Sequence, residues 1–186
     1  MRPDFVLRTG LALGLMAAAA LGDFASAEAR ELTEAEHAGL AATVDSFNAA
    51  MRSSDVERVI ATVPPRVMQA MADKFGMPLD QMRAVAIEQT RQTMAGAAIV
   101  SFGMDLPNAA YAETPDGTPY ALIPTETVMQ FGADKMRAAA DTLALIDEGA
   151  WYLLRVSDDA QVEFLKQVYP AFAEVELPRG TLEPVN

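Results

Sequence analysis

A change in the spacing of apolar residues near Gly96 divides this 186-residue chain into two parts. Before Gly96, apolar residues recur every three or four positions, which is the period of amphipathic helices. After Gly96, the spacing shortens toward the two-residue period of strands. Helices followed by consecutive strands predict an α+β domain, with helices on one side of a curved antiparallel sheet.

The predicted helices lie at 34–52, 56–63, 66–75 and 79–94. The first follows the capping box Thr33-x-x-Glu36, which satisfies free amide groups at a helix start. Its apolar stripe comprises Leu40, Val44, Phe47 and Met51. The predicted buried face of the third helix comprises Met68, Met71, Ala72 and Phe75. The predicted inner side of the fourth comprises Met82, Val85, Ala86, Gln89 and Thr93.

About five antiparallel strands are expected to form a cone-like sheet. They cover residues 98–104, 109–114, 120–131, 136–147 and 151–156. Asp147-Glu148-Gly149 predicts a tight hairpin, because Gly supplies the positive φ that such a turn needs. Pro124 predicts an edge position or a bulge, because proline cannot donate to a sheet ladder. A last helix after Asp159 and an extended tail at 174–186 complete the chain.

The first 27 residues have the pattern of a secretory signal peptide. Arg2 and Arg8 precede an apolar run at residues 11–21, and Ala25-Ser26-Ala27 is a small-x-small cleavage pattern. That run is about half of the roughly 20 residues that span a bilayer, so no membrane anchor is expected after cleavage. We predict a periplasmic or secreted protein, cleaved after Ala27, with one domain at residues 28–186.

Composition argues against several classes of function. A formal charge of −12 disfavours nucleic acid and anionic lipid as partners. The chain has no Cys and only one His, His37, which excludes a zinc site of the His/Cys type. It also lacks a Gly-x-Ser-x-Gly elbow and a phosphate-binding Gly-rich loop. We therefore predict no catalytic residues, no metal and no cofactor. Met68 and Met71 could bind copper(I) through their sulfurs, but their stripe is better explained as core.

The hairpin motif Asp147-Glu148-Gly149-Ala150-Trp151-Tyr152 lies between two apolar runs. Together with the order of elements from Leu32 to Val156, it resembles the nuclear transport factor 2-like (NTF2-like) superfamily, which includes ketosteroid isomerase and SnoaL-type cyclases. The long helical half, the double proline and the last helix depart from the family pattern. The resemblance implies a pocket between the concave sheet face and the helices, used for catalysis in some members and for binding in many.

The preferred hypothesis is an exported NTF2-like module of accessory or binding role. Its pocket would hold a small apolar ligand or be filled by its own side chains. The residues expected to line the pocket are Thr125, Thr127, Met129 and Tyr152.

Two alternatives remain open. The outer sheet face, with Trp151, Leu153 and Arg155, is a candidate interface for a homodimer or another protein, because aromatic residues and Arg favour such sites. A cofactor-free isomerase or cyclase would need a buried carboxylate as its base. Asp141 is the better candidate for that base, because Glu126 is expected to point outward.

Overall fold

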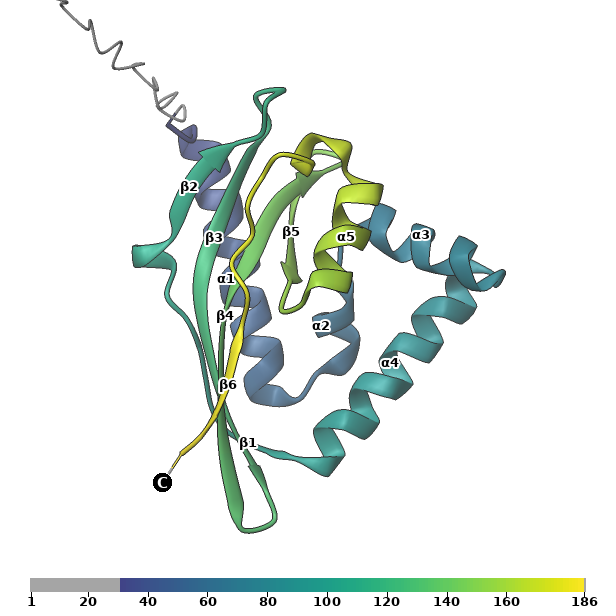
Figure 1. Ribbon diagram of the computed structural model, residues 1–186, viewed down its shortest axis with the longest axis vertical. Helices are drawn as coiled ribbons and strands as arrows, with labels where there is room; N and C mark the ends of the chain where they lie inside the picture. Colours follow the sequence, from purple (N-terminus) through teal and green to yellow (C-terminus); the bar gives the residue numbers. More distant parts are fainter. Residues whose placement is uncertain (1–30, 186) are drawn as a thin grey trace, which may run out of the picture.

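A computed structural model describes residues 31–185, and it confirms the predicted fold class. Four helices come first, a strongly curled antiparallel sheet follows, and a last helix packs near the C-terminus (Figure 1). The predicted signal peptide lies outside the described residues.

The helices begin and end close to their predicted positions. They are α1 (Glu34–Ser53), α2 (Val56–Ala61), α3 (Pro65–Phe75), α4 (Leu79–Gly96) and α5 (Asp159–Val168), with short 3-10 turns η1 (Leu106–Asn108) and η2 (Pro170–Phe172). The capping box at the start of α1 is present: the amide of Glu36 donates to Thr33 Oγ1, and the amide of Thr33 donates to Glu36 Oε2.

The sheet contains six described strands, one more than the sequence predicted. They are β1 (Ala98–Met104), β2 (Ala110–Glu113), β3 (Pro119–Phe131), β4 (Asp134–Asp147), β5 (Ala150–Arg155) and β6 (Thr181–Pro184). Strand β3 has β4 on one side and β1 and β2 on the other, while β5 and β6 share the far side of β4. The sequence pattern missed β6, because its four residues are all exposed and show no alternation.

Pro124 lies in β3, a central strand, rather than in an edge strand. It falls at a gap between two partners, because β2 pairs with residues 119–122 and β1 with residues 125–130. The carbonyl of Pro124 accepts from the amide of Asp105 in the connection between those partners. On this side of β3, no strand pairs with Pro124, so no hydrogen bond is lost because proline lacks an N–H. Locally, the strand is therefore an edge.

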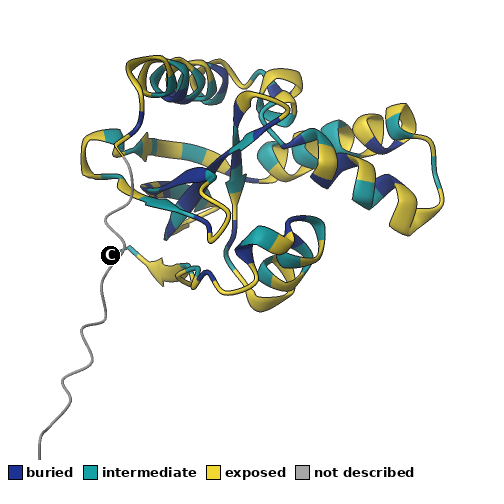
Figure 2. Ribbon diagram, turned by 90° about the horizontal axis from the view of Figure 1, so that it is seen from above, coloured by how far each residue is buried: buried dark blue, intermediate teal, exposed yellow. Residues whose placement is uncertain are grey.

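Helices cover both faces of the sheet, where the sequence predicted one. Figure 2 shows the buried residues along the strands, between α1 on one side and α5 on the other. One buried cluster joins α1 to the sheet and includes Leu40, Val44, Ala121, Ile123, Ala144, Trp151 and Leu153. The other joins α3, α5 and η2 to the opposite face and includes Val67, Tyr120, Leu143, Leu145, Leu165, Tyr169 and Phe172. We call these the α1 face and the α5 face.

Helix α4 stands away from the sheet (Figure 1). Of its 18 residues, all of which the structure describes, only Met82 is buried. Val85, Gln89 and Thr93, expected on the inner side, are exposed, while Met82, Ala86, Thr90 and Met94 are better covered.

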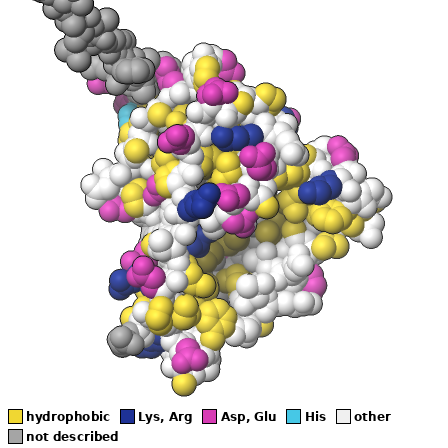
Figure 3. All heavy atoms as spheres, viewed as in Figure 1, with side chains coloured by type: hydrophobic (Ala, Val, Ile, Leu, Met, Phe, Trp, Pro, Cys, Tyr) yellow, Lys and Arg dark blue, Asp and Glu magenta, His cyan; other side chains and the backbone are white. Residues whose placement is uncertain are grey.

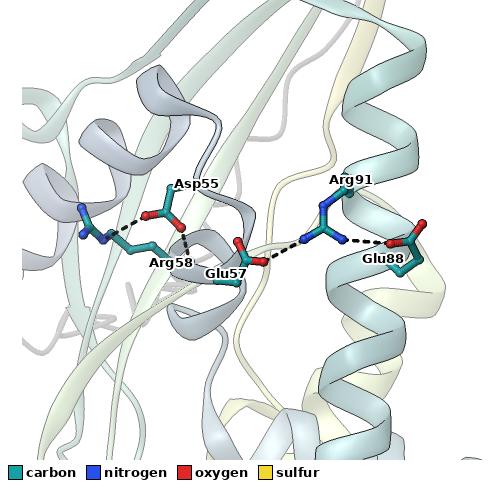
Figure 4. A network of polar contacts seen from close by, with 5 residues as sticks. All are labelled: Asp55, Glu57, Arg58, Glu88 and Arg91. Atoms are coloured by element: carbon teal, nitrogen blue, oxygen red, sulfur yellow. Dashed lines mark hydrogen bonds and ion pairs between the residues drawn. The ribbon is translucent and has the colours of Figure 1, made fainter.

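An ion-pair network on the surface joins α4 to α2. Arg91 donates to Glu57 of α2 at 2.7 Å and to Glu88 of its own helix at 2.9 Å (Figure 4). Asp55 and Arg58 form a separate pair on α2 at 3.6 Å. All these side chains are about a third exposed or more, so water and salt screen each pair and it stabilises the fold only weakly. Packing of Met82 is thus the main tertiary anchor of α4.

We expect Met82→Ala to lower the free energy of unfolding by about 2 kcal/mol, because it leaves a cavity in the cluster with Met68 and Ala72. Amide hydrogen exchange along α4 should also accelerate. Val85→Ala, on the same helix at a position 44% exposed, should change stability by less than about 0.5 kcal/mol. Urea unfolding and hydrogen exchange of both variants check this. Equal effects would contradict the assigned inner side of α4.

Candidate functional site

An apolar groove of about 430 Å³ lies between α3, the end of β5 and α5, and we call it the α3–α5 groove. It is lined by Val67, Met71, Lys74, Phe75, Leu154, Arg155, Asp158, Ala160, Gln161 and Phe164. Figure 3 shows this face of the molecule hollowed beside α4, with hydrophobic side chains gathered along the upper edge of the hollow. The volume falls within the range of about 300–1,000 Å³ that is typical of small-molecule sites.

The position of Phe75 is the unexpected feature of the groove. The sequence placed Phe75 in the core, because it continues the stripe of Met68, Met71 and Ala72. Met68 and Ala72 are indeed buried, but Phe75 is 62% exposed. It is the last residue of α3, before Gly76 closes the helix at a φ of 63°, and the core does not extend that far. An aromatic ring therefore lies open to solvent at the mouth of the groove.

The first turn of α5 forms the opposite wall. The side chain of Asp158 accepts from the amide of Gln161 at 2.9 Å, and the amide of Ser157 donates to Gln161 Oε1 at 2.8 Å. These reciprocal bonds cap the helix. The side chain of Asp158 therefore stabilises the start of α5, which forms this wall.

A buried carboxylate, Asp147, holds the start of α3 against the sheet. It is fully buried and accepts the side chain of Arg66 at 2.6 Å and the backbone amide of Arg66 at 3.2 Å. Arg66 is the second residue of α3, and the residue before the helix, Pro64, offers no side-chain cap. Asp147 therefore caps α3 from 81 residues away, at the end where the helix dipole favours negative charge.

Tyr169 brings the C-terminal segment into the same cluster. Its hydroxyl donates to Asp147 at 2.8 Å, and its ring lies 4.6 Å from the guanidinium carbon of Arg66. Tyr169 also packs in the buried cluster of the α5 face. One carboxylate thereby fixes α3, the β4–β5 hairpin and the end of α5 relative to one another. Both helical walls of the groove depend on this arrangement.

The electrostatics of the cluster keep Asp147 charged. Burial alone would raise its pKa, but hydrogen bonds from Arg66 and Tyr169 outweigh burial and lower the pKa below its ordinary value. Burial, and then the bond to Asp147, raise the pKa of Tyr169 well above that of free tyrosine. The tyrosine thus stays a donor and the carboxylate an acceptor. The sequence predicts Asp147 as a turn residue, and no local pattern distinguishes an acid in a turn from one that caps a distant helix.

The hairpin itself is as predicted. Glu148 and Gly149 have φ angles of 48° and 81°, and they form a two-residue turn between the paired residues Asp147 and Ala150. Two positive φ angles match the twist of the flanking strands. The turn holds Asp147 at the end of β4, where it can reach α3.

The four residues predicted to line one pocket do not come together. Thr125, Thr127 and Met129 lie on the α1 face of β3, whereas Tyr152 pairs with Leu145 on the α5 face. The prediction assumed one inner face, and this sheet is covered on both.

The three residues on β3 are largely buried and contact other residues of the protein. The buried hydroxyl of Thr125 donates to the carbonyl of Ile123 at 2.9 Å and lies 2.8 Å from that of Thr142. Thr127 is also buried, and Met129 is half-buried. Tyr152 instead lines a separate groove of about 250 Å³ among α2, α3 and α4.

The proposed outer interface is largely covered. Trp151 is 8% exposed and Leu153 4% exposed, because both pack on the α1 face. The ring of Trp151 lies so close to Gly39 of α1 that a Cβ there would be 3.1 Å from it. Only Arg155 of this trio is exposed, so the expectation of a free Trp151 surface was wrong.

Asp141 and Glu126 line a wide, open groove of about 740 Å³ on the outside of the sheet. We call it the outer groove, and its other lining residues include Asp105, Pro124, Pro178 and Arg179. Glu126 is exposed, as predicted, and lies 3.4 Å from Arg137. Asp141 is only half-buried and has no apolar enclosure of the kind that tunes a catalytic carboxylate.

Comparisons with family models, curated proteins and solved structures give no match for this chain. Within residues 31–185, no three His, Asp or Glu side chains gather as a metal site would require. His37 is exposed on α1 and contacts the ring of Tyr111. None of the helices described is both long and apolar enough to cross a membrane.

We expect Asp147→Asn to lower the free energy of unfolding by about 2–3 kcal/mol, because it weakens the cap and leaves Arg66 without a counter-charge. Asp141→Asn, a half-buried acid on the same strand, is the matched control and should cost less than about 0.5 kcal/mol. Urea unfolding at neutral pH measures both.

The stabilisation of the fold by Asp147 should decrease as the pH falls. Its pKa is lowered in the folded protein, so its stabilisation is complete above the ordinary carboxyl pKa of about 3.9 and is lost as pH falls through the lower folded value. The difference in stability between wild type and Asp147→Asn should therefore shrink below about pH 4. A difference that grows in acid would contradict the assignment.

Proposed function

We propose that this protein is an exported binding module of NTF2-like type that holds a small apolar ligand in the α3–α5 groove. The observation that carries the proposal is the exposed ring of Phe75 on a groove whose lining residues are mostly apolar. Burying an exposed aromatic ring against a ligand gives a favourable free energy that the unliganded protein does not obtain.

The chemistry of the lining supports binding rather than catalysis. Apart from Lys74, Arg155 and Asp158, the groove presents side chains that neither titrate nor act as strong nucleophiles. Asp158 is engaged as the cap of α5. The groove thus offers shape and apolar surface, which are the properties of a carrier or accessory protein.

Replacement of Phe75 tests the ligand site. We expect Phe75→Ser to weaken binding of N-phenylnaphthylamine, a neutral apolar fluorophore, by about fivefold or more, because the variant loses most of the aromatic contact. Phe131→Ser removes a ring that is 45% exposed on β3, outside the groove, and should leave binding unchanged. Fluorescence titration of both variants and wild type is the measurement.

Two results would overturn this site. Absence of saturable binding to the wild-type protein would remove the ligand function. Equal loss in both variants would show that the probe binds exposed rings without using the groove.

Export gives a separate prediction. Expressed from its full sequence in a Gram-negative bacterium, the protein should appear in the periplasmic or secreted fraction with Glu28 as its first residue. Intact mass and N-terminal sequencing of the fractions would show this. Replacing Ala25 and Ala27 by bulky residues should prevent cleavage, and an uncleaved cytoplasmic wild-type chain would contradict the proposal.

A further inference from the structure

We infer that Met77, in the turn between α3 and α4, is a site of oxidation, and that its conversion to methionine sulfoxide by hydrogen peroxide loosens α4. This inference goes beyond the proposed binding function and does not depend on it. Its basis is that Met77 occupies a packing position at the end of one helix and at the start of the next, while its side chain is only half-buried.

Met77 closes the end of α3. The helix ends at Phe75, and Gly76 follows in the left-handed conformation, with a φ of 63°. The amides of Gly76 and Met77 donate back to carbonyls of the last turn, that of Met77 to Ala72 at 3.0 Å. This is the Schellman pattern, in which the second residue after the helix makes an apolar contact with the last turn. Met77 and Ala72 accordingly belong to one apolar cluster.

Met77 also lies at the start of α4. The residue before the helix, Pro78, provides no side-chain cap, so the position of this end depends on packing. Counted from Pro78, Met77 and Met82 are the two positions whose apolar side chains commonly meet across a helix start, the hydrophobic staple. Met82 is the buried residue of α4, and Met77 packs against the cluster that contains it. One side chain therefore supports the end of α3 and the start of α4.

The cluster around Met77 has no side-chain donor for a sulfoxide oxygen. Its described members are Ile60, Val63, Met68, Met71, Ala72, Met77, Leu79, Met82 and Ala86. All of them carry hydrocarbon or thioether side chains. A sulfoxide is polar, and burying a polar oxygen without a hydrogen-bond donor is costly. The oxidised side chain is therefore more stable when it turns toward water, and this removes its contacts with both helices.

Solvent reaches Met77 more easily than the two buried methionines of the cluster. Met77 is half-buried between the exposed residues Gly76 and Pro78, whereas Met68 is 4% exposed and Met82 3% exposed. In the reaction, the Met77 sulfur attacks one oxygen of hydrogen peroxide. The S–O bond forms, the O–O bond breaks, and the proton of the transferred hydroxyl passes to the leaving hydroxide to give water. The sulfur loses two electrons and the peroxide gains them.

Loss of the Met77 contacts should affect α4 more than the core. Helix α4 stands away from the sheet, and an exposed ion pair between Arg91 and Glu57 links it to α2 (Figures 1 and 4). Helix α1 packs on the sheet through a different cluster. Oxidation should therefore increase hydrogen exchange of the α4 amides and leave those of α1 protected.

Peroxide treatment of the folded protein tests the site. Peptide mass spectrometry should then find a sulfoxide at Met77, while Met68 and Met82 stay reduced. Hydrogen exchange over residues 79–96 should accelerate by about tenfold or more, and that of α1 by less than about twofold.

Three variants identify the sulfur that is responsible. Met77→Leu keeps an apolar side chain but cannot be oxidised, so peroxide should not accelerate exchange in α4. Met71→Leu removes the other half-buried methionine of the cluster, which lies within α3, and α4 should still respond to peroxide as in the wild type. Met77→Gln places a polar oxygen at this position and should accelerate exchange in α4 without peroxide. Circular dichroism verifies that each variant is folded.

Three results would overturn the inference. If Met77 remains reduced while the half-buried Met51 and Met94 are oxidised, peroxide does not reach it. If the Met77 sulfoxide forms and exchange in α4 is unchanged, its packing does not hold the helix. If peroxide loosens α4 equally in the wild type and in Met77→Leu, another methionine is responsible. Should Met77→Leu fail to fold, the wild type still decides, because exchange in α4 must then rise with the fraction of Met77 sulfoxide.

Discussion

The buried carboxylate of Asp147 joins three parts of the structure that are distant in the sequence, namely β4, the start of α3 and the end of α5. It lies at the end of β4, caps α3 from across the sequence and accepts the hydroxyl of Tyr169. Without it, the start of α3 would leave an amide and a guanidinium without their partner on this side of the sheet. The cluster sets the separation of α3 from α5, and the groove is the space left between them.

The sheet gains its stability from cover on both faces. Leu40 and Val44 of α1 pack on one face, while Leu165 and Phe172 pack on the other. In contrast, α4 is a long helix with one buried residue and a surface ion-pair network, so it contributes little to this core.

Local rules of the sequence predicted much of this fold. The capping box at Thr33, the helix stop at Gly76 and the hairpin at Gly149 concern neighbouring residues, and all are present. The residues of the candidate site lie far apart in the sequence, so local patterns do not show that they come together. The alternation in β3 shows that Thr125 and Tyr120 point opposite ways, but not that a second helix layer covers the Tyr120 face. Likewise, periodicity alone places Phe75 in the core, and only the tertiary arrangement exposes it.

We propose that the groove between α3 and α5 receives an apolar ligand, and amide chemical-shift mapping by NMR can locate that ligand. On addition of N-phenylnaphthylamine, we expect saturable shifts at Met71, Phe75, Leu154 and Phe164, on opposite walls of one groove. Shifts confined to Asp105, Glu126 and Asp141 would place binding in the outer groove and contradict a ligand site between α3 and α5.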